Sequence, residues 1–160
     1  MARIEAKLAR MGLQLPPPLS APGGVALPFP WVNLRDGRAF VSGHGPQEAD
    51  GSLAGPFGKV GAEVSEAEAH LLARKTALSM LGSLRRELGD LDRIVAWNRV
   101  FGMVNAAPGF DRMPGVINGF SELIIALWGA EAGRHARSAV GMASLPFGIA
   151  VEIEAEVTLG

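Results

Sequence analysis

The chain has 160 residues, a formal net charge of -1, 48% hydrophobic and 19% charged residues, and no cysteine. This length and apolar content predict one globular domain with a sizeable core and exclude an intrinsically disordered chain. The lysines and arginines are scattered along the chain, so it lacks the clustered positive charge that is typical of nucleic-acid-binding proteins. The lack of cysteine excludes disulfides and thiolate metal sites. A cysteine-free chain suits a reducing compartment, so a cytoplasmic location is expected.

The N-terminal residues 1–12 predict a helix with an apolar face. Ile4, Leu8 and Met11 share one side of it, and Gly12 ends it. The segment lacks the apolar centre of a signal peptide, and no uninterrupted apolar run in the chain approaches the ~20 residues that cross a bilayer. No membrane association is therefore expected.

Consecutive prolines in residues 15–19 predict an extended connector, because proline fixes φ and has no N–H to donate. From its length, the chain is expected to form a single domain over residues 1–160. Within it, residues 1–24 form an N-terminal helix and a proline-rich arm, and residues 25–160 form the core.

Two short strands at residues 31–34 and 39–42 flank a turn in which Gly37 can adopt positive φ. This arrangement predicts an antiparallel hairpin. A second Asp-Gly pair at residues 50–51 predicts another turn in an irregular, glycine-rich segment.

Two long amphipathic helices are predicted. The first begins at Ser65, which can form a capping box with Glu68, and it ends before Gly89. The second begins near Pro114 and ends at Gly129. Each has one apolar stripe, formed by Ala69, Leu72, Ala73, Ala77, Met80, Leu81, Leu84 and Leu88 in the first and by Val116, Ile117, Phe120, Leu123, Ile124 and Leu127 in the second.

Further strands are predicted at residues 94–104, 137–145 and 148–158, which completes the order β-β-α-β-α-β-β. In the last strand apolar residues alternate with Glu152, Glu154 and Glu156, so one face packs on a core and the other presents carboxylates. Because each helix has a single apolar stripe, both are expected to cover the same face of a mixed sheet in an α+β fold. The other face then needs a different cover.

Several motif-like patterns do not meet the requirements of known sites. Residues 55–59 lack the spacing and the hydroxyl residue of a phosphate-binding loop, and residues 43–45 lack the third glycine of a dinucleotide site. His44, His70 and His135 have no metal-binding spacing, so no metal is predicted. On residue pattern alone, the glutamate row of the last strand indicates a solvated, ion-paired surface.

Residues 136–154, ARSAVGMASLPFGIAVEIE, resemble the signature of the Rid family (reactive intermediate deaminase), also called the YjgF or endoribonuclease L-PSP family. In that signature Arg-Ser-x-Val leads through Leu-Pro to Val/Ile-Glu-Ile-Glu. Residues 40–43, 89–94 and 104–105 resemble further family landmarks in the same order, so the similarity extends over nearly the whole chain after about residue 25. The resemblance implies a chorismate-mutase-like fold and a homotrimer with small-molecule clefts between its subunits.

The resemblance also implies an activity, the hydrolysis of reactive 2-imino or enamine acids such as 2-aminoacrylate to a 2-keto acid and ammonia, without a cofactor. Arg137 matches the family arginine that holds the substrate carboxylate, and Glu152 matches the glutamate that positions the attacking water. The two are expected to lie close together on adjacent strands. Gly43 and Asn105 match other substrate-binding positions of the cleft.

Some positions depart from the family pattern. Ala139 stands where the best-known deaminases often have Cys, and Phe29 stands where they commonly have a Tyr that forms a wall of the site. His135 replaces a frequent Pro, and residues 105–118 form a longer segment than in short members, which indicates a divergent subgroup. Two other functions stay open: a non-catalytic trimer that binds small carboxylates or keto acids, and an endoribonuclease, which neither the charge nor the aromatic content favours.

Overall fold

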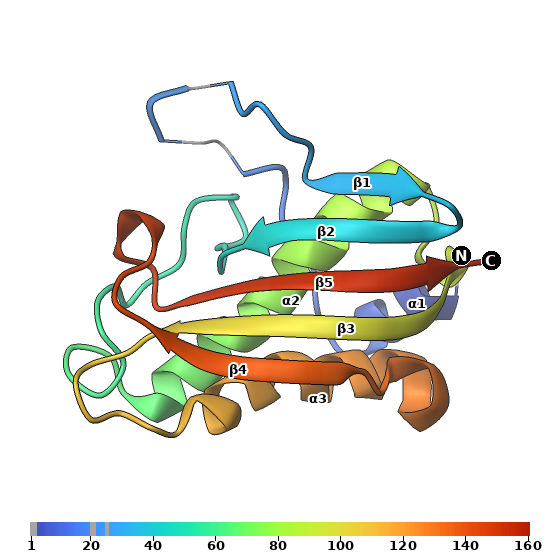
Figure 1. Ribbon diagram of the computed structural model, residues 1–160. Helices are drawn as coiled ribbons and strands as arrows, with labels where there is room; N and C mark the ends of the chain where they lie inside the picture. Colours follow the sequence, from blue (N-terminus) through green and yellow to red (C-terminus); the bar gives the residue numbers. More distant parts are fainter. Residues whose placement is uncertain (1–2, 20–21, 25) are drawn as a thin grey trace.

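One layer of the molecule is a five-stranded sheet and the other consists of helices (Figure 1). The computed structural model describes residues 3–19, 22–24 and 26–160. The sheet has the order β1-β2-β5-β3-β4, in which β3 and β4 are parallel and all other neighbours are antiparallel. The strands are β1 (Val32–Arg35), β2 (Arg38–His44), β3 (Ile94–Asn105), β4 (Ala136–Met142) and β5 (Val151–Leu159). The predicted α+β class, mixed sheet and order of strands and long helices are confirmed.

The β1–β2 hairpin forms where the Asp-Gly pair predicted it. Asp36 and Gly37 have φ values of 48° and 72°, so both central residues of the two-residue turn are left-handed. This turn type matches the right-handed twist of the flanking strands, which sets the pairing of Arg35 with Arg38.

Helix α2 (Glu66–Leu88) begins and ends at the predicted residues. The Ser65 hydroxyl accepts a hydrogen bond from the Glu68 amide at 3.1 Å, and the Glu68 carboxylate accepts one from the Ser65 amide at 2.8 Å. Gly89 ends the helix in the left-handed conformation, with a φ of 78°. All eight residues of its predicted apolar stripe are buried.

Helix α3 (Met113–Gly133) extends past its predicted end, but Gly129 interrupts the helical backbone with φ and ψ of 83° and 172°. Its apolar stripe is buried, and Gly119 lies so close to α2 that an added Cβ would be 2.0 Å from the His70 carbonyl oxygen. By length and composition α3 is apolar enough to cross a membrane. Half of its most apolar window is nevertheless buried inside the molecule, as in the core helix of a globular fold.

Helix α1 (Arg3–Arg10) packs onto the same core, because Ile4 and Leu8 are buried within the main hydrophobic cluster. Met11, which was expected to share this face, is 41% exposed, since the helix has ended and the chain turns at Gly12. The predicted start of this helix at Met1 and the start of the core at Val25 lie outside the described residues.

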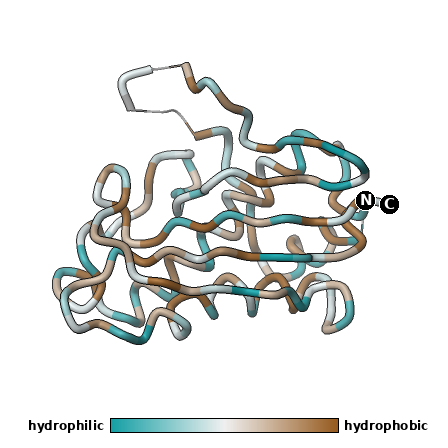
Figure 2. Tube along the Cα trace, viewed as in Figure 1, coloured by the Kyte–Doolittle hydropathy of each residue, from teal (hydrophilic) through white to brown (hydrophobic). Residues whose placement is uncertain are grey.

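The two faces of the sheet have different surroundings. Along β5 the residues alternate between buried apolar side chains toward the helices and glutamates on the opposite face, which Figure 2 shows as alternating brown and teal bands. The described helices lie behind the sheet in Figure 1, so its other face, hereafter the open face, carries no described helix. Phe40 is 42% exposed there, and a hollow of about 440 Å³ extends past Phe101 and Glu154.

Candidate functional site

A cavity of about 230 Å³ lies where the N-terminal arm, the end of β2, the start of β5 and the loop before β5 meet. Three of the predicted site residues line it, namely Phe29, Gly43 and Glu152. Most of the remaining wall is apolar and includes Trp31 and Phe147. The cavity therefore combines one carboxylate with a largely apolar surface.

The Glu152 carboxylate lies directly over the backbone of Gly43. A Cβ atom at position 43 would be 2.1 Å from Glu152 Oε1, so glycine allows the carboxylate to rest on β2. Burial, with a smaller contribution from the nearby Glu154, raises the pKa of Glu152 above its ordinary value. A carboxylate with a raised pKa is a stronger base toward a bound water than an exposed one.

The guanidinium of Arg137 is held by helix α3. Its Nη1 donates to Asn118 Oδ1 at 2.9 Å and to Ser121 Oγ at 3.1 Å, and burial lowers the pKa of the group. Arginine stays charged even so. Its Nη2 makes one long contact, 3.5 Å to the Pro114 carbonyl oxygen. Among the described residues, the edge of the guanidinium formed by Nε and Nη2 makes only this long contact. This edge could therefore donate two parallel hydrogen bonds to a carboxylate.

His135 supports the same arrangement. Its Nδ1 lies 2.8 Å from the Gly133 carbonyl oxygen, so this nitrogen carries the proton. Nε2 then accepts from the Ser121 hydroxyl at 2.9 Å, which leaves a Ser121 lone pair for Arg137. Burial first, and then the charge of Arg137, lower the pKa of His135, which favours this neutral form.

Arg137 and Glu152 of one chain do not lie together, so the expectation of adjacent strands is wrong. Strand β3 separates β4 from β5. Met103 of β3 pairs with Glu152 on one side and with Val140 on the other. Arg137 stands three positions from Val140, and side chains alternate along a strand. Arg137 therefore points to the helix side of the sheet, whereas Glu152 points to the open face.

The remaining predicted residues divide between these two places. Asn105 is buried, and its Oδ1 accepts from Lys59 Nζ at 2.9 Å while its Nδ2 donates to the Ile149 carbonyl oxygen at 3.2 Å. Because Ile149 lines the cavity, Asn105 positions part of the cavity wall. Ala139 pairs with Gly102 and shares the helix-side face of β4 with Arg137.

The residue pattern did not single out most of the apolar cavity wall. Leu27 and Leu53 come from irregular segments, which have no periodicity to indicate packing, and Trp31, which was expected in the first strand, lies just before β1. Phe147 was within reach of sequence analysis, because it follows the Leu-Pro pair of the family signature. Its φ of 58° is left-handed, an uncommon conformation for an aromatic residue.

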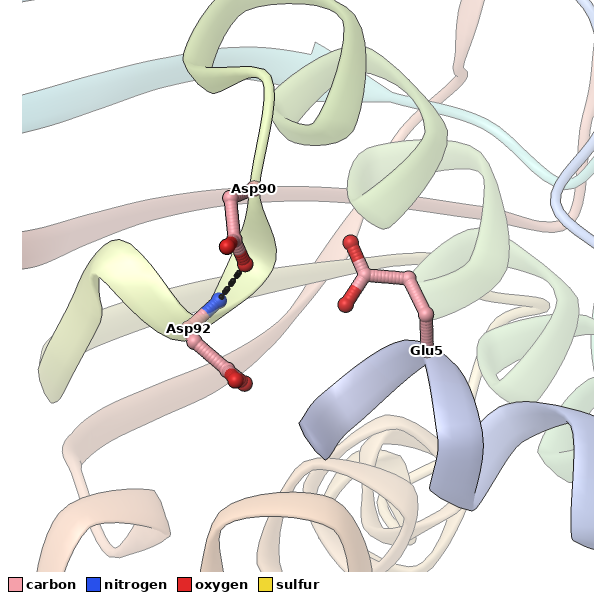
Figure 3. Close-up of side chains that lie close together, drawn as sticks. All are labelled: Glu5, Asp90 and Asp92. Carbon is pink, nitrogen blue, oxygen red and sulfur yellow. Dashed lines mark hydrogen bonds between the residues drawn. The ribbon is translucent and has the colours of Figure 1, made fainter. Parts of the chain in front are cut away.

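Three carboxylates, those of Glu5, Asp90 and Asp92, lie close together away from the cavity, with ligand oxygens within 4.8 Å of one another (Figure 3). Asp92 accepts from the amides of Arg3 and Ile4 at 2.6 and 2.9 Å, and Asp90 accepts from the Asp92 amide at 2.7 Å. Glu5 accepts from the Leu91 amide at 3.2 Å. These bonds fasten α1 to the turn before β3, so the cluster has a structural role.

His44 lies beside the cavity, between the lining residues Gly43 and Gly45. Its ring is 4.9 Å from Trp31, Nδ1 donates to the Ser42 carbonyl oxygen at 2.6 Å, and Nε2 accepts from Ser83 at 2.9 Å. Burial lowers the pKa of His44 from 6.5 to about 4, with the Ser42 carbonyl opposing the shift and Arg86 adding to it. The ring is therefore neutral at pH 7.

The lowered pKa of His44 predicts a loss of stability in mild acid. Between pH 6.5 and about 4 the unfolded chain binds a proton that the folded chain does not. The contribution of His44 to the free energy of unfolding is complete above pH 6.5 and is lost as the pH falls to the folded-state pKa. The total loss is about 3 kcal/mol. Urea unfolding of the protein and of His44→Asn at pH 7.5, 5.5 and 4 measures it. Parallel pH dependences of the two proteins would contradict the assignment.

Comparisons with individual known proteins and solved structures identify relatives of the chain. No family model matches it. Protein TCP17 of Trypanosoma cruzi is 38% identical over 157 residues, which cover 98% of this chain and 94% of that protein. The structure of Atu1372 from Agrobacterium tumefaciens, a protein of unknown function, is 36% identical with a TM-score of 0.87 and covers 99% of this chain and 94% of its own. A Shewanella oneidensis protein that carries an endoribonuclease label is 25% identical, with a TM-score of 0.86 and coverage of 98% and 99%.

The fold also occurs in the Escherichia coli YjgF protein, which is 20% identical with a TM-score of 0.58 over 91% of this chain and 97% of that one. The fold and these relatives define the class of protein, small α+β proteins of the YjgF and endoribonuclease L-PSP type. The chain belongs to the Rid/YjgF family.

Proposed function

We propose that this protein is a hydrolytic deaminase of reactive 2-imino acids, working without a cofactor in the cytoplasm. The observation that carries the proposal is the carboxylate of Glu152. It rests on Gly43 inside a largely apolar cavity, and its pKa is raised by burial. A carboxylate with a raised pKa is a better acceptor for the proton of an attacking water.

The proposed assembly is a homotrimer with each cleft shared between two subunits. Arg137 and Glu152 point to opposite faces of one sheet, so a small substrate that touches both needs them from different chains. The exposed Phe40 and the hollow of the open face, which is lined by aromatic side chains as well as by Arg99 and Glu154, offer a mixed apolar and charged surface that a second subunit can cover. Strand β4, which carries Arg137, is an edge of the sheet and is accessible to such a neighbour.

In the proposed reaction the guanidinium of the partner subunit's Arg137 binds the substrate carboxylate by two parallel hydrogen bonds. Glu152 orients a water molecule and accepts its proton while the oxygen attacks the imine carbon. Return of this proton to the nitrogen gives the carbinolamine. The hydroxyl proton of the carbinolamine then passes to the nitrogen as the C–N bond breaks, which releases ammonia and leaves the 2-keto acid. The balance is one imino acid and one water in, one keto acid and one ammonia out.

Arg137→Lys is expected to lower kcat/KM for 2-iminopropionate by about 10- to 100-fold while the protein stays folded. Lysine keeps the charge but loses the planar fork, and a hydrogen bond to a charged group contributes about 1.5 to 3 kcal/mol. The assay measures ammonia and pyruvate released from iminopropionate generated in situ. Arg35→Lys, at the exposed end of β1, is the matched control and should change nothing. Equal turnover by all three proteins would remove Arg137 from the site.

A non-catalytic binder of small carboxylates or keto acids is the second candidate. The bonds from Asn118 and Ser121 that orient Arg137 serve carboxylate binding whether or not water attack follows. Calorimetric binding of pyruvate without any turnover of iminopropionate would select this function. The endoribonuclease label of the Shewanella protein gives a third outcome to check, namely RNA cleavage that persists in Arg137→Ala.

A further inference from the structure

The cavity next to Glu152 is more apolar than a substrate as small as 2-aminoacrylate requires. Glu152 is the one ionisable residue in its described lining, and the other lining residues are glycine, proline, aliphatic or aromatic. A volume of about 230 Å³ has room for several water molecules, and hence for a side chain larger than methyl. Burial of each additional CH₂ group from such a side chain contributes about 0.8 kcal/mol, roughly fourfold in affinity.

In the structure the arm extends beyond its predicted end at residue 24 as far as β1, and this extension builds one side of the cavity through Leu27, Phe29 and Trp31. The arm is tied to the core on both sides of these residues. Before them, the Pro17 carbonyl oxygen accepts from Gln47 at 3.2 Å. At their end, the Trp31 carbonyl oxygen accepts from the Ser42 amide at 3.0 Å. The wall is therefore positioned by the fold before any ligand arrives.

Phe147, from the loop before β5, adds a further aromatic group to the wall of this cavity. It is 63% exposed and has a φ of 58°, so it gains little from burial and adopts a conformation that asparagine or glycine accommodates better. Its ring lines the cavity. Backbone outliers of this kind occur at ligand sites, where binding rather than stability accounts for the residue.

We infer that the cavity binds the side chain of a 2-imino acid with a large hydrophobic group, branched aliphatic or aromatic, and that Leu27 and Phe147 set this preference. The inference rests on the proposed deaminase function and narrows its substrate class. In the bound substrate the imine carbon faces Glu152, and the side chain extends between the arm and Phe147.

The test compares imines generated in situ from alanine, leucine and phenylalanine. The leucine and phenylalanine imines are expected to have kcat/KM values about 10- to 50-fold above that of the alanine imine, from the contribution of the added CH₂ groups. Calorimetry with 4-methyl-2-oxopentanoate and with pyruvate measures the same preference without turnover. We expect the larger keto acid to bind at least ~10-fold more tightly.

Leu27→Asn is expected to reduce the leucine-to-alanine preference about 10-fold, because a polar group then lines the cavity. Leu27 is 39% exposed, so the substitution spares the core. Phe147→Asn should reduce the same ratio without lowering the melting temperature, since asparagine tolerates the left-handed conformation. Leu71→Asn, at a residue 60% exposed on α2, is the matched control and should leave the ratio unchanged.

The outcomes separate this inference from the function on which it rests. Equal kcat/KM values for the three imines and equal affinities for the two keto acids would overturn the hydrophobic substrate class while leaving the deaminase in place. No turnover of any imine, with tight and selective binding of the larger keto acid, would overturn the deaminase and support the cavity assignment. An unchanged preference in both Leu27→Asn and Phe147→Asn would remove the arm and Phe147 from the site.

Discussion

Replacing Glu152 by glutamine is expected to lower the turnover of a 2-imino acid by ~10²–10⁴-fold, the usual contribution of a general base. Glutamine keeps the shape of the side chain and one acceptor oxygen but is a much poorer base. Binding of keto acids should survive, because in the proposed site the keto acid's carboxylate binds to Arg137 and not to Glu152. Ammonia release and calorimetric titration together distinguish the loss of turnover from a loss of binding.

The position of Glu152 explains why a large effect is expected. An arginine on an adjacent strand would hold Glu152 ionised and weaken it as a base. In the folded chain Arg137 lies on the other side of the sheet, and burial raises the pKa of Glu152 instead. Binding of a partner subunit's arginine would oppose this shift, so the lower end of the range applies if that contact is close.

Glu154→Gln is the matched control for this experiment. Glu154 belongs to the same carboxylate row on β5 but is exposed and lines the hollow on the open face, outside the cavity of Glu152. Its substitution should change turnover little. If both substitutions reduced turnover equally, the row would act through its summed negative charge, and Glu152 would not be the specific water-binding residue.

Mixing two inactive variants is expected to restore about a quarter of the activity of the unsubstituted protein. The variants are Arg137→Ala and Glu152→Gln, each reduced to a few per cent or less on its own. In a mixed trimer of the proposed assembly, each cleft would take Arg137 from one subunit and Glu152 from its neighbour. About three quarters of random trimers are mixed, and about one cleft in three of each mixed trimer is then intact.

The experiment uses co-expressed or co-refolded chains with two different affinity tags, and light scattering confirms the trimer mass. The control mixes Glu152→Gln with a chain that carries both substitutions, a combination in which no cleft can be complete. Restoration in the test mixture alone supports the shared cleft. No restoration in verified mixed trimers would mean that the two residues act within one chain, against the geometry of the sheet. A monomer in solution would refute the assembly itself.

Some parts of this protein were determined by its local sequence. The capping box at Ser65, the glycine at position 89 and the Asp-Gly turn at residues 36–37 each satisfy hydrogen bonds or dihedral angles within a few residues. The alternation along β5 likewise assigns each side chain to one of two faces. These features were predicted correctly because the interactions that produce them are local.

The candidate site was only partly predictable. Resemblance identified Gly43 and Glu152, and the folded chain brings both to one cavity. It could not reveal that Leu27 completes the wall, because this residue lies in an irregular segment without periodicity. Nor could it show that Asn105 binds Lys59, a contact between residues 46 positions apart.

The position of Arg137 relative to Glu152 was decided by tertiary structure alone. Periodicity gives the two faces of a strand but not which strands are neighbours, and the insertion of β3 between β4 and β5 moved the two residues apart. Arg137 lies three positions before Val140, whose side chain faces the open side of the sheet. Because side chains alternate along a strand, Arg137 faces the helices. Strand order arises from the packing of the whole chain. The sequence by itself therefore indicated Arg137 and Glu152 as candidate site residues, and only the fold decided that one chain holds them on opposite faces of the sheet.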